Sequence, residues 1–281
     1  MRMLPAIALF LAATPACWPS EALAKEGPPT VAPAEAVAEE GAQDEKFGIR
    51  LREWYATLEG KLQAQGELIP SFDIDVDDEL GIDDPALAHE IQLSFGLGVR
   101  ITVGAWTGDW KGDRTVSQTF TFADETFAAG TNVDSELELD VYYASFEYGF
   151  ATPSLGSGVS LQLGVLVGAR ILRADGSVDN EFFSAQDSGT GGLPVVGLHA
   201  AVQFAPWLRT DMEVMGLAFS AGGTSASYIE GYVEVVGQLY GLFAGVGYKI
   251  VEIDLADHRK DSDFDLDLTL AGVYFTVGAR F

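Results

Sequence analysis

The most regular feature of the sequence is a long alternation of apolar and polar residues with a period of two. From residue 90 to residue 103, every odd position is apolar and every even position is polar or glycine. The alternation recurs from residue 159 to residue 171, where Leu166 is the one apolar residue at an even position. Successive side chains of a β-strand point to opposite faces, so this pattern predicts long strands with one apolar face.

Ten strands are predicted when the same analysis is extended along the chain. Eight or twelve are the alternatives, because the limits near residues 105–123 and 205–240 can be drawn in several ways. Short turns alternate with longer connections, which is typical of a membrane-spanning β-barrel with short turns on one rim and loops on the other. The predicted strands cover residues 52–66, 87–104, 110–122, 132–150, 158–173, 190–205, 207–219, 227–239, 241–255 and 264–281.

The predicted fold class is all-β, an antiparallel up-and-down transmembrane β-barrel formed by residues 47–281. A closed barrel satisfies its backbone hydrogen bonds internally, so it crosses a membrane without a long apolar segment. Beyond the N-terminal region, no stretch of the sequence reaches the roughly 18 consecutive apolar residues of a transmembrane helix. A secreted soluble β-sandwich that binds a ligand or a divalent cation is the alternative, because its strands also alternate.

The last strand, GVYFTVGARF, has apolar side chains at alternate positions up to its terminal aromatic residue. Here the sequence resembles the C-terminal signature of bacterial outer-membrane β-barrel proteins, a class that includes OmpA-like and porin-like barrels. The resemblance covers about residues 50–281. It implies a location in the outer membrane of the Gram-negative cell envelope. It also implies that the barrel-assembly machinery reads Phe275, Val277 and Phe281.

Two strands depart from a simple apolar-outward pattern. Leu266, Leu268 and Leu270 have the opposite parity from Phe281, although all four belong to the last predicted strand. In the strand over residues 132–150, the apolar residues likewise change parity along its length. Each departure predicts either a β-bulge, which shifts the register by one residue, or a strand that continues beyond the bilayer.

The N-terminal region predicts export. Residues 1–24 have a basic start, an apolar stretch and an Ala-Leu-Ala cleavage site, and we interpret them as a cleaved signal peptide. A lipoprotein site at Cys17 is the alternative, although Pro15 and Thr14, two and three residues before it, fit that pattern poorly. Residues 25–46 are rich in Pro, Ala and Glu and lack an apolar period, which predicts a disordered linker.

The charge is strongly negative for a folded chain. The 281 residues include 16 Lys and Arg against 42 Asp and Glu, a formal net charge of −26. This excess argues against nucleic acid as a partner, because such proteins neutralise phosphates with clustered cations. Because 48% of the residues are hydrophobic, the charge belongs to a folded protein. In a membrane barrel we expect it at the aqueous ends.

The polar faces of the predicted strands define the expected lumen. If the apolar faces meet outer-membrane lipid and lipopolysaccharide, the opposite side chains fill the interior. Both signs of charge occur among them, so we expect a salt-bridged plug and a structural, surface or narrow-channel protein of unknown oligomeric state. The predicted lumen residues are Glu59, Lys61, Gln92, Arg100, Glu138, Asp140, Arg170, His199, Arg209, Asp211, Glu213, Glu230, Glu234 and Lys249.

An acidic connection at residues 67–86 is the candidate metal site. Its carboxylates include some with the spacing of a calcium loop, but Asp78 stands where the tight turn of an EF-hand requires glycine. We expect no firmly bound cofactor, and either a solvated acidic loop or loose binding of Ca²⁺ or Mg²⁺. The residues concerned are Asp73, Asp75, Asp77, Asp83 and Asp84.

Catalytic signatures are weak. The pairs Asp83-Asp84 and Asp257-His258 are similar to the acidic and Asp/His pairs of omptins, the ten-stranded outer-membrane proteases. Asp257 and His258 are adjacent, however, and adjacent side chains of an extended strand point to opposite sides. We therefore expect a non-enzymatic protein, with a protease- or lipase-like enzyme acting at the loop rim as the alternative.

Overall fold

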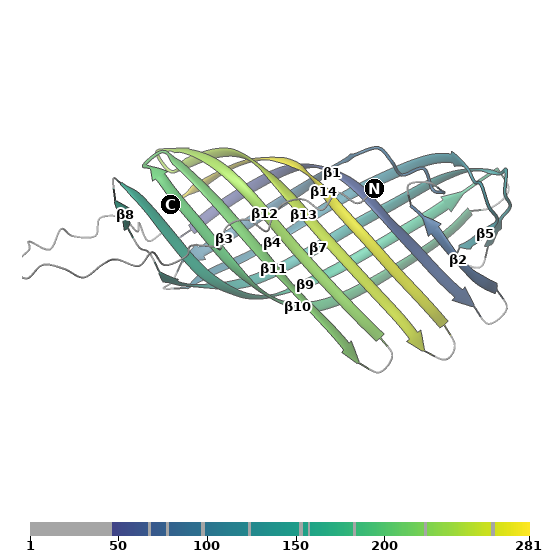
Figure 1. Ribbon diagram of the computed structural model, residues 1–281. Helices are drawn as coiled ribbons and strands as arrows, with labels where there is room; N and C mark the ends of the chain where they lie inside the picture. Colours follow the sequence, from purple (N-terminus) through teal and green to yellow (C-terminus); the bar gives the residue numbers. More distant parts are fainter. Residues whose placement is uncertain are drawn as a thin grey trace, which may run out of the picture. The chain divides into compact units, whose positions relative to one another are not determined.

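The chain forms a closed antiparallel β-barrel in the part that the structure, a computed structural model, describes (Figure 1). That part comprises residues 47–66, 69–76, 79–96, 99–122, 125–151, 154–156, 158–181, 184–221, 224–259 and 262–281. The predicted signal peptide and linker lie outside it. No helix in it is long and apolar enough to cross a membrane.

Ten of the described strands make the barrel wall. Each pairs with its neighbours in chain order, and the first strand pairs with the last to close the ring. The fold class and the strand number are therefore confirmed, and the β-sandwich alternative is wrong. The wall strands are β1 (Phe47–Gly66), β3 (Ala86–Gly96), β4 (Arg100–Thr115), β7 (Asn132–Ala151), β9 (Val159–Asp179), β10 (Ser184–Ala205), β11 (Leu208–Ala221), β12 (Thr224–Leu239), β13 (Leu242–Arg259) and β14 (Ser262–Arg280).

Four shorter strands complete the described structure. β2 (Ile69–Asp75) pairs with β1, and β8 (Ser154–Gly156) pairs with β9. β5 (Phe120–Phe122) and β6 (Glu125–Phe127) form a separate two-stranded sheet. The connections that carry β2, β5 and β6 lie at the end of the barrel opposite the start of β1 and the end of β14, and we call this end the loop rim (Figure 1). The other end is the short-turn rim.

Two strand boundaries were predicted wrongly. The predicted strand 87–104 covers β3 and the start of β4, which pair as an antiparallel hairpin, and the predicted strand 110–122 covers the end of β4 and β5. In this hairpin the residues that face each other have the same parity, as with Phe95 opposite Ile101. The outward positions therefore stay odd on both sides of the turn, and the alternation continues through it without a break.

The outer face of the barrel is apolar in the half next to the short-turn rim. Phe146, Phe275 and Val277 are 53%, 66% and 53% exposed, and aliphatic or aromatic residues occupy most neighbouring outward positions. Phe150, Trp207 and Phe281 lie nearer the rim and are also exposed, as in an aromatic girdle. We call this surface the apolar belt. A continuous exposed surface of this kind is stable only against lipid.

Towards the loop rim the outer face of the wall becomes polar and the inner face becomes apolar. Glu59 and Lys61 of β1 are exposed, whereas Leu58 on the opposite face is buried. In β14, Leu266, Leu268 and Leu270 point inward and are buried, and the pairing of β14 with both neighbours shows no register shift. These leucines therefore reflect a strand that continues past the lipid, and the bulge alternative is wrong for β14.

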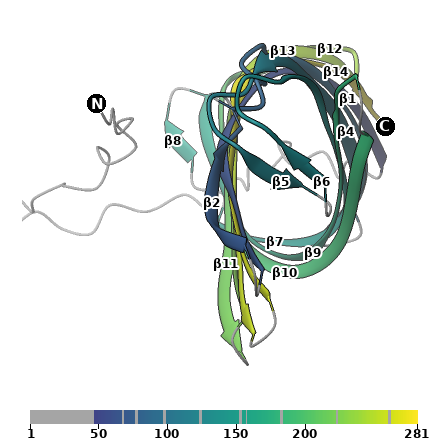
Figure 2. The same ribbon diagram turned by 90° about the vertical axis from the view of Figure 1, so that its right-hand side faces the viewer.

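The loop-rim half of the barrel contains an apolar core, to which two connections contribute. One supplies Ile74, Val76, Leu80 and Ile82, and the other supplies Val116, Phe120 and Phe127; all seven side chains are at most 5% exposed. These seven residues are called the apolar plug. Figure 2, which faces the loop rim, shows β5 and β6 across the barrel opening.

Hydrogen bonds hold the plug to the wall. The Val76 backbone N–H donates to the Gly60 carbonyl at 3.0 Å, and the Ser135 hydroxyl donates to the Leu80 carbonyl. A close backbone approach at Gly112 adds to these bonds, since a Cβ there would stand 2.2 Å from the Leu80 oxygen. The plug is thus a packed part of the fold.

Candidate functional site in the barrel interior

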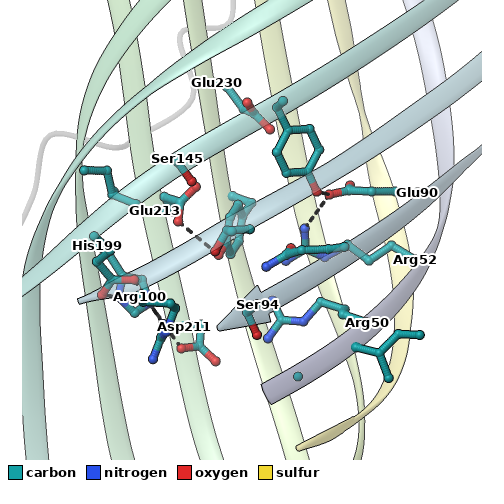
Figure 3. Close-up of a pocket in the computed structure, with 18 of the residues that line it drawn as sticks. Arg50, Arg52, Glu90, Ser94, Arg100, Ser145, His199, Asp211, Glu213 and Glu230 are labelled. Carbon is teal, nitrogen blue, oxygen red and sulfur yellow. Dashed lines mark hydrogen bonds and ion pairs between the residues drawn. The ribbon is translucent and has the colours of Figure 1, made fainter. Parts of the chain in front are cut away.

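Below the plug, the interior of the barrel is filled with charged and tyrosine side chains. We call this group the lumen cluster (Figure 3). Its members project from the inward positions of the wall strands, opposite the apolar belt. The residues are Arg50, Arg52, Glu90, Arg100, Tyr143, Glu147, Arg170, His199, Arg209, Asp211, Glu213, Tyr228, Glu230, Tyr232, Glu234, Lys249 and Tyr274.

A chain of ion pairs crosses the centre of the cluster. Arg52 Nη1 lies 2.9 Å from Glu90 Oε1, and Glu90 Oε2 lies 3.2 Å from Lys249 Nζ. Lys249 Nζ is also 3.0 Å from Glu230 Oε1, and Arg170 donates from both Nε and Nη2 to Glu230 Oε2 at 3.1 Å. These five side chains belong to β1, β3, β9, β12 and β13. The chain of ion pairs therefore ties distant parts of the wall together.

Aromatic rings replace part of the water that these buried cations have lost. Lys249 Nζ lies 5.0 Å from the ring centre of Trp54. The guanidinium carbons of Arg52 and Arg170 lie 4.7 Å from the rings of Tyr232 and Tyr143, respectively. Cation–π contacts of this kind gain strength when the cation is desolvated. The cluster is thus a packed assembly in which few charges face water.

A second group of charges lies nearer the short-turn rim. His199 Nδ1 is 2.7 Å from Glu147 Oε1, and its Nε2 is 3.3 Å from Asp211 Oδ1. Arg100 pairs with the same Glu147 at 3.0 Å, and Arg209 Nε donates to Asp211 at 2.8 Å. The imidazole is thus held on both sides by carboxylates that also bind arginines. This arrangement has no nucleophile at its centre and is typical of a structural network.

The cavity within the cluster is small and polar. Its volume is about 50 Å³. Buried polar atoms without a hydrogen bond include Nε and Nη2 of Arg52, both carboxylate oxygens of Glu234 and Oδ2 of Asp211, although Glu234 forms ion pairs with Arg50 and Arg52 at 3.5 Å. A cavity of this size admits a few water molecules, whereas sites for small organic ligands measure about 300 Å³ or more.

Most of the predicted lumen residues do point into the barrel. Those inside are Gln92, Arg100, Arg170, His199, Arg209, Asp211, Glu213, Glu230, Glu234 and Lys249. The placement of Glu59, Lys61, Glu138 and Asp140 was wrong, because they lie on the outer face above the apolar belt, where that face is polar.

The main omissions from the prediction were Arg50, Arg52 and Glu90. A signal for the two arginines exists in the sequence, since Phe47, Ile49 and Leu51 occupy the odd positions around them. That pattern assigns the even positions at the start of β1 to the interior. Glu90 likewise alternates with apolar Ile91 and belongs to the polar face of β3.

The predicted metal residues are only partly described. Asp83 and Asp84 are exposed, and Asp75 lies in β2 opposite Lys61. The side chain of Asp73 and all of Asp77 lie outside the described residues. Within the described part, no group of three or more His, Cys, Asp or Glu side chains is arranged to hold a metal ion. Loose Ca²⁺ or Mg²⁺ binding stays a prediction.

A second cavity opens among acidic residues at the loop rim. Its volume is about 470 Å³, and we call its lining the acidic rim. Lys111 Nζ lies 2.6 Å from Glu136 Oε1 and 3.2 Å from Asp109 Oδ2, outside the apolar belt. These contacts raise the pKa of Lys111, and the hydrogen bond from Lys111 lowers the pKa of Glu136. The charged lining residues are Asp83, Asp84, Lys111, Asp113, Asp134, Glu136 and Asp179.

Comparisons with known proteins give structural similarity only. No family model and no curated protein matches the sequence. The outer membrane protease OmpT from Escherichia coli has 11% identity and a TM-score of 0.44, over 85% of this chain and 98% of that chain. Neisserial surface protein A has 12% identity and a TM-score of 0.33, over 84% and 97%. The outer membrane protein AlkL has 12% identity and a TM-score of 0.36, over 92% and 97%.

The closed antiparallel wall, the lipid-compatible apolar belt and the aromatic short-turn rim together decide the class. The chain is an outer-membrane β-barrel protein. In such a barrel the short turns face the periplasm and the longer loops face the outside. We therefore expect the acidic rim of this outer-membrane barrel to be extracellular. Phe275, Val277 and Phe281 are exposed on its outer face, 66%, 53% and 74% respectively.

Proposed function

We propose that this outer-membrane barrel is a non-conducting, non-enzymatic surface protein. The observation that carries the proposal is that two barriers of different chemistry lie in series along the interior. The lumen cluster joins opposite walls by ion pairs next to the periplasm. The apolar plug and the core around it fill the extracellular half.

Each barrier opposes a different kind of solute. An ion that entered from the periplasm would have to displace one partner of a buried ion pair and leave the other uncompensated. It would then meet Trp110, Leu139 and Val76, all 0% exposed, where an ion has no polar partner. An apolar solute arriving from outside would meet the charged cluster. Neither class of solute has a continuous favourable path.

Single-channel recording is the test of the proposal. The refolded protein should insert into a planar lipid bilayer without producing discrete, ohmic conductance steps. The opened control changes both barriers: it combines Phe120→Ser and Phe127→Ser, which replace two rings stacked 5.2 Å apart, with Arg52→Ala and Glu90→Ala in the lumen cluster. Reproducible conductance steps from the unmodified protein would refute the closed lumen.

The absence of enzymatic activity has a separate test. Asp83 and Asp84 are exposed at the acidic rim. The side chains of Asp257 and His258 lie outside the described residues, so the proposal does not depend on their geometry. Fluorogenic peptides and lipopolysaccharide incubated with the refolded barrel should remain intact. Product that appears with the protein and disappears in Asp83→Asn Asp84→Asn would replace this proposal with a rim-site hydrolase.

A further inference from the structure

The barrel wall is open between β10 and β11 on its extracellular side. Pairing of these strands extends from Ala205 opposite Leu208 up to Val196 opposite Gly216, and it ends there among the described residues. Both strands nevertheless continue, β10 back to Ser184 and β11 on to Ala221. We call this opening the seam. It comprises residues 184–195 of β10 and residues 217–221 of β11.

Each strand beside the seam is paired on its other edge. β10 pairs with β9 from Gln203 up to Ser184, and β11 pairs with β12 up to Ala221 opposite Thr224. Figures 1 and 2 both show the extracellular end of β11 diverging from β10, which stays in the ring of strands. The seam therefore has two formed strand edges whose backbone groups lack a β partner on one side within the described part of the chain.

The composition of β10 explains why the wall opens here. Pro194 has no N–H to donate and stands next to the last paired positions. Gly189, Gly191 and Gly192 follow along the free edge, and glycine weakens strand pairing because it has no side chain to pack. A Cβ at Gly189 or Gly191 would meet no atom within 4 Å, so no side chain or loop covers the faces of the strand at these positions.

The free edge has few of the features that keep exposed strands from pairing. Natural edge strands are protected by lysines, bulges or covering loops. Within Ser184–Val195 the sequence has Asp187 as its one charged residue and Pro194 at its base. From Gln186 to Gly192 every residue is exposed. The edge is consequently available to a further strand.

The charge around the seam selects the kind of strand. Asp187 lies on the free edge, and Asp179 on β9 pairs in register with both Ser184 and Asp134. Asp179 and Asp134 belong to the acidic rim. Arg173, which is bound to Asp175 at 2.8 Å, is the nearby cation on β9. A strand that carried Lys or Arg would meet complementary charge here, and an acidic strand would be repelled.

We propose that the seam binds an extended, basic polypeptide by adding it as a strand to the free edge of β10. Backbone hydrogen bonds would supply the pairing, as in other cases of β-strand addition. Basic side chains would lie near Asp187 on the edge itself and about 10 Å from Asp179 on β9, the neighbouring strand on the other side of β10. This proposal goes beyond the closed lumen and does not depend on whether the barrel conducts.

The test is fluorescence anisotropy with synthetic peptides of alternating Lys and Val and the full refolded barrel in detergent micelles. Two further peptides carry N-methyl groups on the Lys residues alone or on the Val residues alone, at the same charge. In an antiparallel pair, alternate residues direct their backbone groups to the same neighbour. One N-methylated peptide should therefore bind at least about tenfold more weakly, which is a loss of about 1.4 kcal/mol, and the other should bind like the parent.

A pair of protein variants distinguishes strand addition from simple charge attraction. Pro194 pairs with β9 although it has no backbone N–H, which indicates that even-numbered residues of this segment direct their N–H groups to the seam. Thr190 is also even-numbered, so we expect the backbone N–H of Thr190 to face the seam. Thr190→Pro should reduce binding about tenfold or more, and Thr190→Val, which keeps the N–H, should bind like the unmodified protein. Heat-modifiable gel mobility shows that both variants are folded.

Three results would overturn the proposal. Equal binding of the two N-methylated peptides would show that backbone pairing is not involved. Equal binding by Thr190→Pro and Thr190→Val would place the peptide elsewhere on the acidic rim. Dimerisation of the barrel that Thr190→Pro abolishes, without peptide binding, would make a second copy of the chain the occupant of the edge.

Discussion

Lys249 illustrates how a single buried charge organises the interior. It is 1% exposed and is the cation shared by Glu90 and Glu230, which belong to different strands. Burying one ammonium among two carboxylates is tolerable only because the three groups satisfy one another. Lys249 therefore contributes more to the stability of the barrel than a single exposed lysine would.

Replacing Lys249 by methionine should destabilise the barrel strongly. Lys249→Met keeps the volume and leaves two carboxylates facing each other without the ammonium, for which we expect a loss of about 3–5 kcal/mol. The measurement is urea unfolding of the barrel in lipid vesicles. Lys111→Met, which removes an exposed ammonium that also contacts two carboxylates, is the control and should cost much less. Equal losses in the two variants would contradict this account.

At the acidic rim, the Lys111–Glu136 contact predicts a local pH dependence. The pKa of Glu136 is lowered by its hydrogen bond from Lys111, so the pair stabilises the folded rim above the unfolded carboxyl pKa of about 4.3. That contribution is lost as the pH falls through the lower, folded pKa. In Lys111→Gln, NMR titration should show the Glu136 pKa rising towards its ordinary value. An unchanged titration would show that the contact does not form in solution.

At the scale of elements, the packing of the plug depends on one glycine of β4. A Cβ at Gly112 would overlap the Leu80 carbonyl, so Gly112→Val should displace the plug while the wall still closes. We expect faster proteolysis of the extracellular connections, while the lumen cluster keeps the barrel closed to ions. Gly189→Val is the matched control, because a Cβ there meets no atom within 4 Å. A protease-resistant Gly112→Val barrel would contradict this role.

Phe281 completes the contact between the first and last strands. Its N–H donates to the Phe47 carbonyl at 2.8 Å, its carbonyl accepts from the Phe47 N–H at 3.2 Å, and its ring stacks on Phe47. Phe281→Ser removes the ring contact, so we expect slower conversion to the heat-modifiable, folded form in lipid. Phe150→Ser, which changes an exposed aromatic residue at the same rim, is the control. Equal folding rates for both variants would contradict a specific role of the terminal ring.

Hairpin geometry determined which elements the sequence could predict. Where facing residues differ in parity, as with Leu239 opposite Leu242, the apolar positions change from odd to even across the turn and reveal the boundary. Where they share parity, as with Phe95 opposite Ile101, the turn is hidden. The strands on either side of residues 239–242 were therefore separated correctly, and those on either side of residues 97–99 were merged.

At the scale of the whole molecule, the sequence predicted the class of the fold but not the filling of its interior. Alternation shows that each strand has one polar and one apolar face. It does not show where along the strand the outward face changes from apolar to polar. Glu59 and Glu138 were assigned to the lumen because polar residues were assumed to face inward along the whole strand. That assumption holds within the lipid, but these two residues lie beyond it, where the outer face is polar. The seam and the apolar plug depend on long-range pairing and on loop packing, which no local pattern records.

The exchange of faces along the wall also fixes how deep the protein sits in the membrane. Near the transition on β1 and β3, Glu53 and His89 meet at 2.6 Å on the outer face, with Leu51 and Tyr55 on either side of Glu53. Moving the barrel towards the periplasm would bring Glu59 and Lys61 into the hydrocarbon. Moving it towards the outside would expose the apolar belt to water. The vertical position is therefore set by the chain itself. The height at which the seam opens above the lipid is set with it.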